Sequence, residues 1–489
     1  MLFNSYIFLL VFLPIVLGIY FPLRLTNRER AAKLFLIAAS LFFYGWWEWK
    51  YVPLVLISIG VNYGMSVWLD RKPAIAKPIL IATLIFNLGL LGYFKYANFF
   101  VETFDALTGM ELTFRKVLLP LAISFFTFQQ VAYIVEVYKD RKAAQSLTDY
   151  GLFVLFFPHL IAGPITHHKE MLPQFAVAGR GPLPWFYLTT GLTILILGLG
   201  KKVIFADTLA KIADPVFAAA RLGDPLTAVT AWTGALAYTF QLYFDFSGYS
   251  DMAIGLALMF GIRMPVNFAS PYKATSIIDF WRRWHISLSR FLRNYLYIPL
   301  GGNRQGPVRR HLNLMITMAL GGLWHGAGWT FLAWGVLHGS YLVINHLFRQ
   351  VAGKRGSPAR DLFGWALTFL GVVFAWVLFR AETFESAALV LKGMVGVFPA
   401  DGLYVRDVLP IEFVSIAIAA MVAFFLPSSL ELARYPHAIP GGEYEAAEAP
   451  LKPRRWPLSP PVTALLLGVV FAIVLAKLPD PGVFLYFNF

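Results

Sequence analysis

The chain has 489 residues, of which 58% are hydrophobic and only 14% are charged. Soluble domains average about 25% charged residues, so this composition argues against an ordinary soluble protein and predicts one embedded in lipid. The formal net charge of +14 is typical of basic cytoplasmic loops, and no nucleic-acid partner is predicted because no basic run carries a recognition motif.

The first apolar run, residues 2–23, is long enough to span a membrane. No basic residue precedes it and no small-residue cleavage site follows it, which argues against a signal peptide. Basic residues instead follow the run, which predicts a retained span with its N-terminus outside. Further spans are predicted at about 31–47, 51–69, 78–97, 117–138, 185–205, 228–262, 361–380, 409–427 and 462–478.

Two segments depart from this regular pattern. Residues 150–165 are too short and too interrupted by proline for a simple span, so a re-entrant segment is predicted there. Residues 263–310 and 349–360 are both basic and are placed on the cytoplasmic side. The apolar stretch 311–348 is therefore predicted to enter and leave on the same side through short arms, bending near residues 321–328. The expected fold is a single all-α polytopic domain, residues 1–489, with a cytoplasm-facing invagination.

His325 lies at the predicted bend and is flanked by glycines. An ionisable side chain inside the bilayer is costly and is a functional candidate, and nearby glycines allow a substrate to approach the backbone closely. A pKa near its ordinary value of about 6.5 suits a general base that takes a proton from a hydroxyl. The alternative is a buried histidine that donates one hydrogen bond inside a helix hairpin.

His285 lies in the segment DFWRRWHISLSRFLRNYLYIPL, where apolar side chains recur at helical spacing opposite arginines. This pattern predicts an amphipathic surface helix with His285 beside its apolar face. An interfacial polar residue is the alternative for His285. A set of nearby side chains could bind the phosphates and the body of a donor, with membrane anchoring as the alternative for its basic members. This set comprises Arg282, Arg283, Arg290 and Trp324.

Asp245 and Asp251 flank the polar sequence FSGYS within the predicted span 228–262. Two carboxylates at this depth could line a polar tunnel or bind a cation. No further ligand accompanies them in the sequence, so no metal site is predicted. The nucleotide-binding, serine-hydrolase and zinc-protease motifs GxxxxGK[ST], GxSxG and HExxH do not occur.

Five segments spread over most of the chain carry a family resemblance: PLAISFFTFQ, FFPHLIAGPI, QLYFDFSGYSDMAIG, WRRWHISLSRFLRNYLYIPLGGNR and LGGLWHGAGWTFLAWGVLHG. Together they resemble the bacterial polysaccharide branch of the membrane-bound O-acyltransferases, which includes alginate O-acetylation proteins and, more distantly, teichoic-acid D-alanyl transferases. By this resemblance, His325 matches the family's essential histidine and His285 its second conserved polar position. Glu136 stands where aspartate is expected, which preserves a carboxylate.

The resemblance implies a multi-pass O-acyltransferase of the bacterial inner membrane with no bound cofactor. A cytoplasmic thioester, acetyl-CoA or an acyl-phosphopantetheine carrier, would enter the basic funnel, and His325, helped by His285, would activate a hydroxyl arriving from the other side. A periplasmic SGNH-type protein would complete transfer to a polysaccharide such as alginate. The alternatives are a lipid, protein or D-alanyl acyltransferase of the same fold, and a channel or transporter, for which the sequence shows no inverted repeat.

The last residues, FLYFNF, resemble the aromatic, tyrosine-containing endings of this branch, and counting the spans places them outside. The sequence contains no cysteine, which excludes an acyl-cysteine intermediate. Tyr486 is therefore a candidate acyl relay, its weakly nucleophilic phenol being activated by a base such as His325. The alternative is an aromatic anchor at the outer interface.

Overall fold

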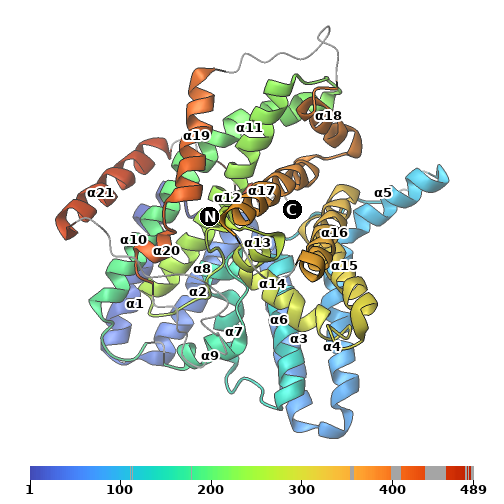
Figure 1. Cartoon of the computed structure of the whole chain (residues 1–489). Coiled ribbons are helices and arrows are strands. Elements are labelled where there is room, and N and C mark those ends of the chain that lie inside the picture. The colour runs from blue at the N-terminus through green and yellow to red at the C-terminus, as the bar shows by residue number, and fades with distance from the viewer. Residues whose placement is uncertain are drawn as a thin grey trace. The chain divides into compact units, whose positions relative to one another are not determined.

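The computed structural model describes residues 1–110, 112, 114–177, 179–352, 357–397, 409–435, 459–478, 482 and 484–485. Regular secondary structure in these residues is helical, with no β-strand among them, which confirms the predicted all-α class (Figure 1). The chain divides into two compact units, and each unit combines segments that are distant in the sequence. α10 (Trp185–Gly200) and α12 (Ala228–Met259) each contribute residues to both units.

Unit 1 comprises Met1–Ile196, Ser250–Val266 and Ala433–Ala447. Besides its parts of α10 and α12 it contains η1 (Ile7–Phe12), α1 (Leu13–Leu25), α2 (Glu29–Glu48), η2 (Trp49–Tyr51), α3 (Val52–Arg71), η3 (Pro73–Ile75), α4 (Ala76–Leu91), η4 (Gly92–Tyr96), α5 (Ala97–Thr108), α6 (Ile123–Asp140), α7 (Leu147–Leu155), α8 (Phe157–Leu160) and α9 (His168–Ala176). A buried amide pair joins two of these helices: Asn62 of α3 and Asn87 of α4 exchange hydrogen bonds of 3.1 and 2.7 Å. Mutual pairing satisfies both polar groups in an otherwise apolar interior.

Unit 2 comprises Leu197–Tyr249, Asn267–Leu432 and Glu448–Phe489. Besides its parts of α10 and α12 it contains η5 (Lys201–Ala206), α11 (Asp207–Leu222), η6 (Pro271–Lys273), α13 (Ile277–Arg283), α14 (Ile286–Leu292), η7 (Arg293–Tyr297), α15 (Gly306–His325), α16 (Trp329–Ala352), α17 (Pro358–Arg380), α18 (Phe384–Met394), α19 (Pro410–Phe425), α20 (Ser429–Leu432) and α21 (Pro460–Lys477). The YFDFSGYSD sequence does not interrupt α12, which continues through it as one 32-residue helix. Helical backbone satisfies its own polar groups, so polar side chains need not break the helix.

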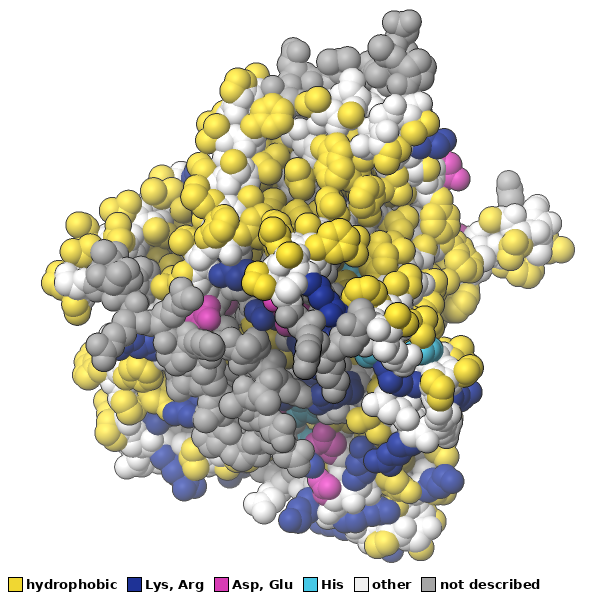
Figure 2. Space-filling model, in the orientation of Figure 1, with side chains coloured by type: hydrophobic (Ala, Val, Ile, Leu, Met, Phe, Trp, Pro, Cys, Tyr) yellow, Lys and Arg dark blue, Asp and Glu magenta, His cyan; other side chains and the backbone are white. Residues whose placement is uncertain are grey.

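Seven helical runs in the described residues are long and apolar enough to cross a membrane. They are Ile7–Leu25, Glu29–Arg71, Pro73–Thr108, Trp185–Leu222, Trp329–Val351, Pro358–Arg380 and Pro460–Lys477. Many of their large apolar side chains face outward, and Figure 2 shows one face with broad hydrophobic areas and separate patches of Lys and Arg. Lipid is the solvent that suits such a surface. The protein is therefore a multi-pass membrane protein, while the number and direction of its crossings stay predictions.

α15 and α16 form an antiparallel hairpin whose turn, at residues 326–328, falls within the predicted bend (Figure 1). Two glycines allow the helices to touch: a Cβ on Gly322 would collide with the carbonyl oxygen of Phe331, and a Cβ on Gly335 with that of Met318. The arms have 20 and 24 residues, so they are longer than the short arms expected from the sequence. At 1.5 Å per residue each matches the roughly 30 Å hydrocarbon core, and re-entry of 311–348 stays a prediction.

We expect Gly335→Ala to destabilise this hairpin, because backbone atoms of α15 occupy the space that the new methyl group needs. Overpacking of this kind costs about 1–3 kcal/mol, which should lower the thermal midpoint of the detergent-solubilised protein by several degrees. Gly371→Ala in α17 is the matched control, since its Cβ would meet only ordinary contacts with Tyr341. Equal midpoints for the two variants would show that the close approach at Gly335 does not support the hairpin.

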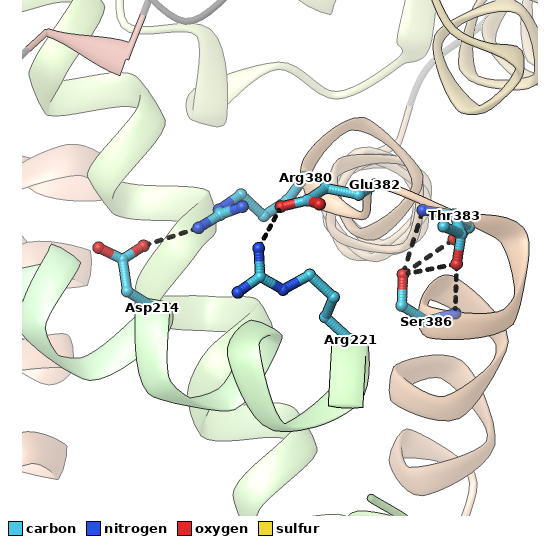
Figure 3. A network of polar contacts seen from close by, with 6 residues as sticks. All are labelled: Asp214, Arg221, Arg380, Glu382, Thr383 and Ser386. Atoms are coloured by element: carbon cyan, nitrogen blue, oxygen red, sulfur yellow. Dashed lines mark hydrogen bonds and ion pairs between the residues drawn. The ribbon is translucent and has the colours of Figure 1, made fainter. Parts of the chain in front are cut away.

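A polar network in unit 2 fixes the junction between α17 and α18 beside α11 (Figure 3). Arg380 donates to Asp214 at 3.0 Å, and Arg221 donates to Glu382 at 3.3 Å. The side chains of Thr383 and Ser386 cap the start of α18. Exposed ion pairs contribute only about 0–1 kcal/mol each, so the network matters mainly for the position of the junction. Phe379, the residue before Arg380, packs on His325.

Candidate active site

His285 lies at a break in the segment that the sequence predicts to be one amphipathic helix. α13 ends at Arg283, Trp284 is extended, and α14 begins at Ile286. His285 itself has φ +45° and ψ +53°, a left-handed conformation that costs a non-glycine residue about 1–2 kcal/mol. The predicted continuous helix is therefore wrong. His285 is completely buried, which agrees with its predicted place beside the apolar face and not with the interfacial alternative. Periodicity identifies an apolar face but does not detect a one-residue break.

Asn267, 18 residues earlier in the chain, holds this break. Its backbone carbonyl accepts the N–H of Ile286 at 3.0 Å, and its Oδ1 accepts the N–H of Ser287 at 3.3 Å. The same Oδ1 accepts the hydroxyl of Ser287 at 2.9 Å and lies 3.1 Å from Nδ1 of His285. Asn267 thus satisfies N–H groups at the start of α14 that have no partner within the helix. This support stabilises the left-handed turn.

His325 is the last residue of α15 and is 3% exposed. Three aromatic side chains surround its ring, at centroid distances of 5.0 Å for Trp324, 5.2 Å for Trp334 and 5.3 Å for Phe379. They come from α15, α16 and α17, so the hairpin and the following helix together position the imidazole. Aromatic walls leave it few rotamers and exclude bulk water.

The structure brings the two candidate histidines together: their ring centroids are 6.1 Å apart with an angle of 56° between the planes. Phe246 of α12 packs edge-on against His285 at 4.7 Å. Burial lowers the pKa of His285 to about 3, so its imidazole is neutral at physiological pH and can accept a hydrogen bond. Two imidazoles in an apolar, aromatic-walled centre can carry out acid–base chemistry on a bound hydroxyl.

The family model described as "MBOAT, membrane-bound O-acyltransferase family" matches residues 110–381, which include both histidines. The chain belongs to the membrane-bound O-acyltransferase family. A peptidoglycan O-acetyltransferase of Helicobacter pylori is 45% identical over 81% of this chain and 80% of its own length. The probable alginate O-acetylase AlgI of Pseudomonas aeruginosa is 44% identical over 81% of this chain and 75% of its own. A teichoic acid D-alanyltransferase of Streptococcus thermophilus is 29% identical over 53% of this chain and 68% of its own. The protein is thus a membrane O-acyltransferase. The family match and the named relatives argue against the alternative of a channel or transporter.

The predicted donor-binding residues of this acyltransferase fall into two groups. Trp324 is buried against both histidines, with ring centroids 5.0 Å from His325 and 6.1 Å from His285, so it forms part of the wall of the centre. Arg282 is exposed and Arg290 partly exposed, while Arg283 is held by Asp279 at 2.9 Å. The arginines lie on α13 and α14, directly before and after the His285 break. Their role with the donor stays a prediction.

Asp245 is buried and ion-paired, a state that sequence reasoning did not foresee. Lys202 lies between two carboxylates, with its Nζ 2.6 Å from Asp245 and 2.8 Å from Asp207. A buried charge requires such pairing. The position of Lys202 at the end of the apolar run 185–205 was the available sequence signal. Asp251 is also buried but belongs to the unit 1 part of α12.

The segment just before Tyr486 contacts this ion-paired cluster. The N–H of Leu485 donates to Asp245 at 3.1 Å, and the ring centroid of Phe484 lies 4.7 Å from Nζ of Lys202. The approach is close: a Cβ on Gly482 would collide with the carboxylate of Asp207. Tyr486 itself lies outside the described residues. The chain is therefore anchored, up to Leu485, in the unit that contains both site histidines.

Two histidines of unit 1, His167 and His168, share one carboxylate partner. The polar run His-His-Lys-Glu at residues 167–170 is, from the sequence, most simply interpreted as a solvated loop. In the structure His167 and His168 are buried at the start of α9. Both face Glu136, with each Nδ1 3.3 Å from one of its carboxylate oxygens. The loop interpretation is therefore wrong, because the carboxylate of α6 offers these side chains partners inside the protein. In the described part of the chain, no cluster of three or more potential ligands for a metal ion occurs.

His338 of α16 is a histidine of unit 2 that sequence reasoning did not single out. It is completely buried, and its Nδ1 accepts the indole N–H of Trp281 at 3.3 Å. Trp334 contacts His338 at 4.8 Å and His325 at 5.2 Å, so one indole packs on both rings. The glycine after His338 repeats the His-Gly pair at residues 325–326, which is the signal that could have found it.

Proposed function

We propose that this protein acetylates hydroxyl groups of a polysaccharide outside the cytoplasm, using a cytoplasmic acetyl thioester, with His325 as general base. Acetyl-CoA or an acyl-phosphopantetheine carrier is the donor, and the protein lies in the bacterial inner membrane. The observation that carries the proposal is the buried pair of imidazoles, with ring centroids 6.1 Å apart, within the matched family region. The 45% and 44% identical relatives named for O-acetylation support acetyl over D-alanyl, whose named relative is 29% identical.

In the proposed reaction His325 takes the proton of the attacking hydroxyl as its oxygen bonds to the thioester carbonyl carbon. The tetrahedral intermediate then collapses, the carbon–sulfur bond breaks, and the thiol leaves with the proton that the histidine returns. His285 orients the reacting groups through Nε2, the ring nitrogen that does not contact Asn267. Aromatic walls keep water away from the thioester, which favours transfer over hydrolysis.

The direction of transfer is tested with oriented membrane vesicles. Radiolabelled acetyl-CoA is added outside inverted vesicles, whose cytoplasmic face is exposed, and outside right-side-out vesicles. We expect the label to reach a polysaccharide acceptor inside the inverted vesicles only, because the basic segment 263–310 faces the donor. Equal labelling from the periplasmic side would overturn the cytoplasmic donor. Labelling of the polysaccharide would be measured with and without a periplasmic SGNH-type protein, because the proposal assigns the final transfer to such a partner.

Arg282→Ala combined with Arg283→Ala should raise the apparent KM for acetyl-CoA more than it lowers kcat. The reason is that basic side chains attract a polyanionic donor before the chemical step. Steady-state kinetics at fixed ionic strength measures both constants. The matched control is Arg71→Ala with Lys72→Ala, two exposed positions that carry the same charge. A change confined to kcat, or an equal KM effect in the control, would remove these arginines from donor binding.

A further inference from the structure

We infer that Asn267 is the positioning residue that fixes the tautomer of His285, so that Nε2 is the nitrogen presented to the reacting groups. The inference deepens the proposed function by assigning the chemical state of one site histidine. It rests on a set of hydrogen bonds that meet at a single atom, Oδ1 of Asn267.

The identity of that atom follows from its neighbours. A backbone N–H can only donate, and the N–H of Ser287 points at Oδ1 of Asn267 from 3.3 Å. If the amide were turned by 180°, two N–H groups would face each other at this distance, so the atom is the amide oxygen. An amide oxygen can only accept. The nitrogen of His285 that lies 3.1 Å from it, Nδ1, must therefore carry the hydrogen.

The neutral imidazole has one N–H, and Asn267 thereby leaves Nε2 of His285 as the acceptor nitrogen. The charged form would carry hydrogens on both nitrogens, but both side chains are completely buried, and burial penalises the charged form of an imidazole. Asn267 also accepts hydrogen bonds from the backbone N–H groups of Ile286 and Ser287, and these two bonds fix the ring of His285 relative to α14. Asn267 thus sets both the orientation and the proton acceptor of His285.

The groups around His285 are mostly apolar. α12 brings Phe246, the segment before η6 brings Phe268, and α15 brings Trp324 together with the titratable ring of His325. On its own segment, DFWRRWHISLSRFLRNYLYIPL, the charged side chains are Asp279, Arg282, Arg283, Arg290 and Arg293, of which Arg283 and Asp279 pair with each other. A negative charge introduced at position 267 would therefore act mainly on His285.

Asn267→Asp is the principal test, because the carboxylate keeps the acceptor and the shape but adds a charge beside Nδ1–H. A nearby opposite charge raises the pKa of a histidine by about 1–3 units. We expect the acid limb of the profile of kcat/KM against pH to move to higher pH by that amount relative to wild type, with activity recovering at alkaline pH. An acid limb at the same pH in the variant and in wild type would overturn the inference.

Ser287→Ala is the matched control, since it removes a hydroxyl from the same oxygen but leaves the Asn267–His285 bond. Its profile should keep the wild-type shape, and a shift equal to that of Asn267→Asp would show a general structural effect. The tautomer is also measured directly, by ¹⁵N NMR of the histidine-labelled protein with His285→Gln to assign the signal. A protonated Nδ1 is expected. A protonated Nε2 would reject the inference, and this result does not depend on whether the proposed acyl transfer is correct.

Discussion

His325→Ala is expected to lower acetyl transfer by about 10²–10⁴-fold while leaving expression and membrane insertion intact. The loss follows from removing the general base: Trp324, Trp334 and Phe379 cannot accept a proton from a hydroxyl. His285, whose pKa burial lowers to about 3, is a much weaker base. His325→Gln should lose as much, because an amide keeps polarity without basicity. The measurement is transfer from radiolabelled acetyl-CoA by purified protein in liposomes, with size-exclusion profiles to verify folding.

His346→Ala provides the comparison for this loss. His346 is on α16, one arm of the same hairpin, and is partly exposed near His311 instead of His325. Its removal should change the rate by less than about twofold, in line with surface substitutions generally. Near-wild-type acetylation in His325→Ala, or equal losses in the two variants, would sink the assignment of the base.

The sequence predicted correctly what depends on composition, periodicity and motif. Apolar content established a polytopic all-α protein, and the basic segments on either side of residues 311–348 predicted a bend near residues 321–328, where the turn of the α15–α16 hairpin lies. The family motifs selected His285 and His325, which lie 40 residues apart and meet in unit 2. Motif resemblance supplied this pairing, since neither histidine has a distinctive local pattern.

Features that depend on tertiary partners were not predictable. The break at His285 exists because Asn267 satisfies the start of α14 from another segment, which no periodicity records. The sequence suggests that Asp245 and Asp251 act as two carboxylates of one polar tunnel, whereas the ion partner of Asp245 is Lys202, 43 residues earlier. Burial of His167 and His168 likewise depends on Glu136 of α6. In each case a buried polar group is explained by a distant partner.

Tyr486→Phe is expected to abolish acetylation of the polysaccharide, because the substitution keeps the ring and removes only the hydroxyl. In the proposed relay His325 takes the phenol proton, the phenol oxygen attacks the thioester, and the thiol leaves; the acetyl ester then passes to the acceptor. Leu485, the preceding residue, donates its N–H to Asp245 in the unit that contains His325. With no cysteine in the sequence, tyrosine is the remaining nucleophile of this tail.

The relay and the aromatic anchor give opposite rankings of two variants. Phe484→Ala removes a ring that is 1% exposed and contacts Lys202 and Tyr249, so it weakens docking of the tail. A relay predicts partial loss for Phe484→Ala and complete loss for Tyr486→Phe, together with one acetyl group on the C-terminal peptide by mass spectrometry. Tyr63→Phe in unit 1 controls for loss of a tyrosine hydroxyl as such. Normal acetylation in Tyr486→Phe, with a defect in Phe484→Ala, would show that the tail is only an anchor.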